Sequence, residues 1–132
     1  IVQHANDYSL VTPSHPAVRG ETLVAYMSGL GAVSPPVVSG MPAPADPISY
    51  ALIFIDKQHD ALSLNVGGVS TDLLFAGLTP GFAGLDQINF QVPASAPSGD
   101  VPMTLAQVVC PFGCGSTGPS TLTSRSVKLA IR

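Results

Sequence analysis

The sequence has no tryptophan, and charged side chains make up only 10% of its 132 residues, against about 25% in a typical soluble domain. Its only glutamate is Glu21, which excludes a coiled coil, because that structure needs abundant Glu, Lys and Leu. Five Lys and Arg residues and a net charge of −3 cannot form the basic stripe that nucleic acid requires. We therefore expect no nucleic-acid partner.

Long apolar runs are also missing. The longest, from Tyr50 to Ile55, has the length of a strand, far below the roughly 20 residues that span a bilayer. We expect no membrane span.

The usual signatures of catalysis are scarce. The sequence has no Gly-x-Ser-x-Gly motif and no convincing pair of acidic residues for glycoside hydrolysis. Asp56, His59 and Asp60 would offer ligands to a surface cation, but a solvated hairpin tip is the simpler interpretation. The other histidines, His4 and His15, are too scattered to predict a cluster. We therefore expect no catalytic residues, no cofactor and no metal site, and we predict that the protein is not an enzyme.

Glycine and proline, in contrast, are abundant, with 13 residues each. They separate segments in which apolar and polar residues alternate, which is the pattern of β-strands. Gly67-Gly68 predicts a two-residue hairpin turn, and Val127, Leu129 and Ile131 form an apolar stripe on one face. The expected strands are 21–28, 50–56, 61–66, 69–76, 85–92, 100–109 and 121–131, with 1–4 and 10–12 as short candidates at the start.

The segment from Ser34 to Pro47 carries five prolines, so it cannot form a helix or a central strand. It is expected to be extended and polyproline-like. Seven or eight short strands with regularly spaced turns predict one all-β domain over residues 1–132. Its expected fold is an immunoglobulin-like antiparallel β-sandwich with a long Pro-rich loop.

The two cysteines, Cys110 and Cys114, flank a short segment with Pro111 and Gly113, which favour a tight turn. In an oxidising compartment we expect them to form a local disulfide. A redox pair is the weaker alternative, because such motifs have two intervening residues rather than three. Half of a metal site is also weaker, because further ligands are not nearby in the sequence.

Two blocks carry a family resemblance: Gly20–Gly31 (GETLVAYMSGLG) and Leu74–Pro93 (LFAGLTPGFAGLDQINFQVP). Together with an opening strand at Val2–Thr12, they resemble an uncharacterised Solibacter-type family of bacterial C-terminal domains in exported proteins. The resemblance covers nearly the whole chain. It implies an immunoglobulin-like sandwich in a secreted or cell-surface protein, and it implies no catalytic residues. The chain departs from the family in a longer Ile53–Ala61 segment and in the Cys110–Ser120 loop.

The sequence begins at Ile1 rather than at a start Met, from which we expect a processed, exported product. Its first segment, residues 1–12, is apolar and is expected to pair within its own domain or with a neighbouring copy. The candidate assembly residues are Ile1, Val2, Leu10 and Val11.

Charged side chains normally hinder pairing at sheet edges, and this chain has few of them. We therefore predict an extracellular structural module that self-assembles into a surface filament through sheet-edge or strand-donation contacts. The alternative is a ligand- or carbohydrate-binding adhesion domain, although only Tyr8, Tyr26 and Tyr50 offer tyrosine rings and tryptophan is absent. O-linked glycan is an expectation for the Ser-, Thr- and Pro-rich segments 34–47 and 116–126.

Overall fold

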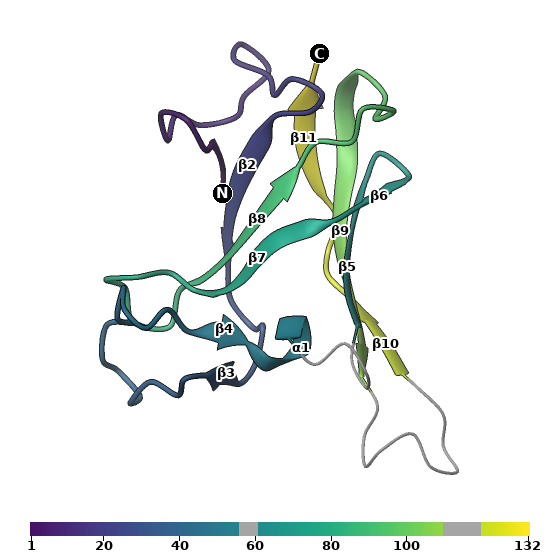
Figure 1. The fold of residues 1–132 in the computed structure, drawn as a ribbon. Coiled ribbons are helices and arrows are strands. Elements are labelled where there is room, and N and C mark those ends of the chain that lie inside the picture. Colours follow the sequence, from purple (N-terminus) through teal and green to yellow (C-terminus); the bar gives the residue numbers. More distant parts are fainter. Residues whose placement is uncertain (56–60, 110–119) are drawn as a thin grey trace.

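The computed structural model of the protein describes residues 1–55, 61–109 and 120–132, which form two antiparallel sheets (Figure 1). The first sheet has the order β1-β2-β8-β7-β4-β3. Its strands are β1 (Val2–His4), β2 (Thr22–Met27), β8 (Asp86–Gln91), β7 (Leu73–Leu78), β4 (Tyr50–Ala51) and β3 (Val33–Ser34).

The second sheet is built around its longest strand, β9 (Gly99–Val109). On one side β9 pairs with β5 (Ala61–Val66), which in turn pairs with β6 (Val69–Thr71). On its other side β9 pairs with two successive strands, β11 (Val127–Ile131) and β10 (Ser120–Thr123). These two strands therefore form one edge of the second sheet.

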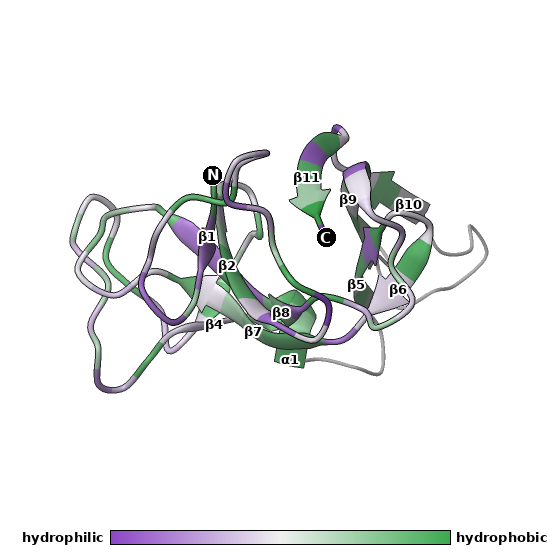
Figure 2. Ribbon diagram, turned by 90° about the horizontal axis from the view of Figure 1, so that it is seen from above, coloured by the Kyte–Doolittle hydropathy of each residue, from purple (hydrophilic) through white to green (hydrophobic). Residues whose placement is uncertain are grey.

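One buried apolar cluster joins the two sheets, so the fold is a β-sandwich, as expected (Figure 2). The first sheet contributes Leu23 of β2 and Ile88 and Phe90 of β8, and the second contributes Leu64 of β5 and Leu129 of β11. All five are almost fully buried. In β8 the predicted alternation is confirmed, because Ile88 and Phe90 are buried while the residues between them are only half-buried.

The candidate strand 10–12 is not formed, since only isolated bridges join Leu10 to Gln3 and Thr12 to His15. Three further predicted strands were wrong in extent. The apolar run from Tyr50 forms only the short β4 and then the single helical turn α1 (Leu52–Ile55). The predicted strand 69–76 is interrupted at Asp72, where the chain passes from β6 in the second sheet to β7 in the first. The predicted strand 121–131 is divided into β10 and β11. The described residues therefore hold eleven strand segments instead of seven or eight.

The Pro-rich segment is largely irregular, as its composition predicts. Beyond Ser34, which ends β3, its only pairing within the described residues is an isolated bridge between Ala43 and Pro80. Cys110 and Cys114, with their predicted disulfide, lie outside the described residues, as do Asp56, His59 and Asp60. Within the described ranges, no helix has the length and apolar character needed to cross a membrane.

Candidate functional site

A groove of about 510 Å³ opens between the edges of the two sheets, and we call it the edge groove. β1 and β2 form one wall, and β10 and β11 form the other; Figure 2 shows β1 and β2 facing β11 across this side of the sandwich. The apolar lining residues are Ile1, Val2, Val11, Ala25, Tyr26, Met27, Leu30, Leu64, Met103, Leu105, Leu122, Val127 and Leu129.

The base of the edge groove is formed by residues of the apolar core. Leu64 and Leu129 are nearly inaccessible members of the core cluster and also line the groove. At the rim, large apolar side chains are exposed: Ile1 to 78%, Leu122 to 60% and Val127 to 48%. Exposed apolar side chains around a groove make it a candidate site of interaction with other molecules.

The break between β10 and β11 shapes the second wall. Ser124 lies between the two strands and still bonds to Leu105 of β9. Its hydroxyl accepts a hydrogen bond from the Leu105 N–H at 3.0 Å, in place of a backbone carbonyl, and its own N–H donates to the Leu105 carbonyl at 2.8 Å. Such an irregularity bends an edge strand. Leu122 and Val127, on either side of this break, both line the groove.

Among the described residues, only the far end of the β11 edge pairs with another segment of the chain. There the N–H of Ala17 donates to the carbonyl of Ala130 at 2.9 Å, and its carbonyl accepts from the N–H of Arg132 at 3.0 Å. In the part of the chain that the structure describes, no backbone hydrogen bond continues this pairing along Lys128. A sheet edge of this kind is a template for strand pairing.

The edge groove is cationic in a chain of net negative charge. Arg125 and Lys128 line it, and both are exposed. Its described lining includes no Asp or Glu, and the only ion pair among the described residues lies elsewhere, between His4 and Glu21. The groove therefore favours an occupant with apolar side chains and negative charge.

Three of the four predicted assembly residues, Ile1, Val2 and Val11, line the edge groove. The fourth, Leu10, is exposed outside it and forms an isolated bridge with Gln3. β1 pairs with β2 of the same chain, with Val2 opposite Ala25. In the single chain, the N-terminal segment therefore completes its own sheet and forms a wall of the groove.

The structure brings together a polar cluster that we did not predict, beside a second cavity of about 480 Å³. The rings of His4 and His15 stack with their centroids 4.2 Å apart. Buried His4 places Nδ1 2.5 Å from a carboxylate oxygen of Glu21 and Nε2 3.3 Å from the His15 carbonyl. Both ring nitrogens of His4 therefore face acceptor oxygens. The residues lie far apart in the sequence, so no local pattern could have revealed the cluster.

Asp7, Ser9 and His15 lie at the edge of this cluster, but their order differs from that of a catalytic triad. The Ser9 hydroxyl donates to Asp7 at 2.7 Å, and His15 Nδ1 lies 3.3 Å from the same hydroxyl. In a triad the acid orients the histidine, whereas here it binds the serine. Among the described residues, no group of three or more His, Cys, Asp or Glu side chains is arranged to hold a metal ion.

Comparison of the chain with protein-family models, with curated proteins and with solved structures found no match. The functional argument therefore rests on the edge groove: its apolar lining, its open sheet edge and its positive charge.

Proposed function

We propose that the chain is a non-enzymatic structural module of an extracellular or cell-surface protein, which assembles with copies of itself through the edge groove. The observation that carries this proposal is the groove itself, where exposed Ile1, Leu122 and Val127 lie at two sheet edges and continue into the core. Burial of apolar surface drives most protein association, so this surface supplies a driving force for assembly. The low charge of the chain adds little mutual repulsion.

We also infer that the sandwich is of the immunoglobulin type. The strand order supports this inference. One sheet has the order β1-β2-β8-β7, which matches A-B-E-D of a constant-type immunoglobulin domain, and the other has β5-β9-β11, which matches C-F-G. β3 and β4 extend one sheet, and β6 extends the other. This order and the resemblance to the Solibacter-type family together support an exported module. O-linked glycan on its Ser- and Thr-rich segments belongs to the same proposal.

Carbohydrate binding is less well supported than assembly. Sugar sites are commonly built on aromatic platforms, yet Tyr26 is the only aromatic residue in the described lining of the edge groove. The exposed tyrosines, Tyr8 and Tyr50, lie outside the groove, in a turn near the N-terminus and in β4. The groove therefore favours an apolar protein contact over a sugar.

Replacing Leu122 by aspartate should abolish assembly at concentrations where the unmodified chain associates. The substitution places a charge in the apolar contact, and loss of an anchoring side chain costs about 2 kcal/mol or more, roughly a 30-fold weaker association. Sedimentation velocity over a range of concentrations, with electron microscopy of the concentrated samples, measures the effect.

Leu74→Asp is the matched control, because Leu74 is an equally exposed leucine (57%) in strand β7, outside the edge groove. It should leave assembly unchanged. If the unmodified chain stays monomeric at high concentration, or if both variants associate equally, the groove is not an assembly site.

A further inference from the structure

We infer that the edge groove of one copy receives a projecting turn of the next copy, formed by Asp7, Tyr8 and Leu10 and here called the N-terminal knob. This inference rests on the proposed assembly and names its partner surface. It predicts a head-to-tail contact between two different surfaces of the same chain.

The N-terminal knob presents an aromatic ring on a strained backbone. Tyr8 is 63% exposed and has a φ of 57°, a conformation that is unfavourable for a bulky residue. The turn is held in place because the Tyr8 N–H donates to the His4 carbonyl at 2.9 Å and the Ser9 N–H donates to Asp7 at 2.9 Å. Exposed tyrosines on a rigid support are typical anchors of protein interfaces.

The charges of the knob and the groove are complementary. Asp7 is fully exposed, and hydrogen bonds from the Ser9 hydroxyl and N–H lower its pKa, so it is ionised at neutral pH. Arg125 and Lys128 supply positive charge at the edge groove. The apolar Tyr8 and Leu10 side chains would then meet the apolar lining, and Asp7 would meet the cations.

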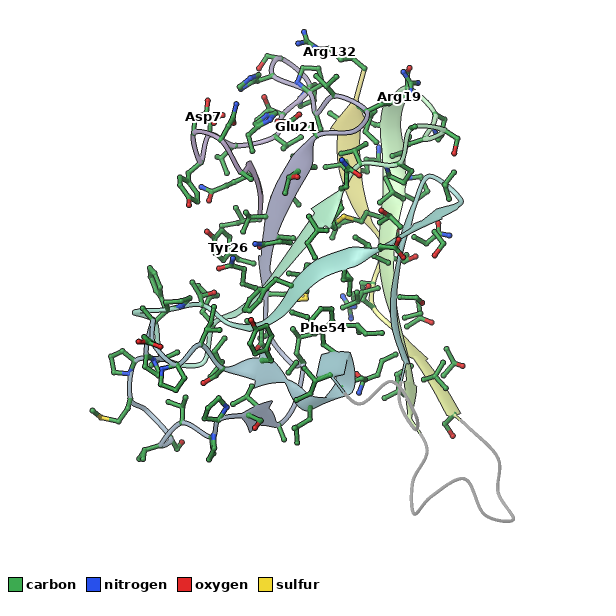
Figure 3. All side chains as sticks on the ribbon, in the orientation of Figure 1. Asp7, Arg19, Glu21, Tyr26, Phe54 and Arg132 are labelled. Carbon is green, nitrogen blue, oxygen red and sulfur yellow. The ribbon has the colours of Figure 1, made fainter. Side chains whose placement is uncertain are left out.

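The same charges oppose the simplest symmetric alternative. Pairing two copies groove to groove would place Arg125 and Lys128 of one copy against those of the other, and like charges across an interface are unfavourable. The knob does not line its own groove among the described lining residues, and Figure 3 shows Asp7 above Tyr26, toward the end of the molecule where Arg132 lies. A contact between two different surfaces continues from copy to copy, forming a ring if the rotation between copies closes and an open filament if it does not.

Tyr8→Gly tests the knob without weakening the monomer. Glycine adopts a positive φ freely, so the substitution removes the ring and relieves the strain. We expect self-association to weaken by about 30-fold or more. Phe82→Gly is the matched control, because Phe82 is an exposed aromatic residue in a turn outside both surfaces, and it should associate normally. Asp7→Asn, which retains the acceptor oxygen of the turn, should weaken association mainly at low salt.

Mixing two inactive variants distinguishes head-to-tail from symmetric contact. Tyr8→Gly retains an intact groove, and Leu122→Asp retains an intact knob. An equimolar mixture should form a one-to-one dimer that grows no further, measured by sedimentation and by native mass spectrometry with one variant isotopically labelled.

The outcomes separate this inference from the proposed function. If Leu122→Asp blocks assembly while Tyr8→Gly assembles like the unmodified chain, the groove is the assembly site but the knob is not its occupant. If each variant blocks assembly but their mixture stays monomeric, the head-to-tail contact is wrong. If the unmodified chain never associates, both proposals fail.

Discussion

Replacing Gly77 by alanine should destabilise the fold by about 3 kcal/mol, although it adds only one methyl group. Gly77 lies in β7 opposite Tyr50 of β4, and the neighbouring Leu78 N–H donates to the Ser49 carbonyl at 3.0 Å. A Cβ atom at Gly77 would overlap the carbonyl oxygen of Ser49 and lie 2.9 Å from Tyr50 Cα. Because these are backbone atoms, no side-chain rotation relieves the overlap, and β4 would have to separate from β7.

Urea denaturation of the purified variant measures this loss of stability. Gly84→Ala is the control: a Cβ there meets open space, and its φ of +67° costs about 1–2 kcal/mol through backbone strain alone. Gly77 has no positive φ, so a loss of stability larger than that of the control shows the effect of the steric overlap. Equal unfolding midpoints for Gly77→Ala and the unmodified chain would show that β4 does not lie directly against β7.

The sequence predicted strands well where one face of the strand is buried. In β8 the alternation is confirmed, because Ile88 and Phe90 are buried and Asn89 between them is half-buried. In β2 it is not, because Leu23, Val24 and Ala25 are all buried. It failed where a run is apolar throughout, as at Leu52–Ile55, because such a run has no period that separates a strand from a helix. It also failed at Asp72, since the passage of a chain between sheets depends on the other strands and leaves no local pattern.

The candidate site was predictable on one wall only. The apolar N-terminal segment pointed to Ile1, Val2 and Val11, which line the edge groove. The opposite wall was missed because Val127 belongs to the same apolar stripe as Leu129, which predicts that both are buried. Leu129 is buried, but Val127 is exposed at the rim of the edge groove. Likewise, His4, His15 and Glu21 form a cluster only because the fold brings the start of β2 beside β1.

Replacing Glu21 by alanine should destabilise the protein by about 3 kcal/mol, because it removes the carboxylate that compensates a buried histidine. Glu21 accepts a hydrogen bond from the Val18 N–H at 2.8 Å and faces Nδ1 of His4 at 2.5 Å. Without it, Nδ1 of the buried His4 and the N–H of Val18 would lose their hydrogen-bond partner. β1 should loosen from β2, and with it the first wall of the edge groove. Glu21→Gln preserves the shape and an acceptor oxygen, so its loss should be smaller.

The pH dependence of stability tests whether the charge of Glu21 matters or only its shape. Burial raises the pKa of Glu21, but hydrogen bonds from Val18 and His4 outweigh it, so the folded pKa lies below the ordinary value of 4.5. A lowered folded pKa means that the stabilisation is fully present well above pH 4.5 and is lost as the pH falls through the folded value. The free energy of unfolding of the unmodified chain should therefore decrease below pH 4.5, and that of Glu21→Gln should decrease less. Parallel pH profiles for the two proteins would show that the carboxylate acts only through its shape.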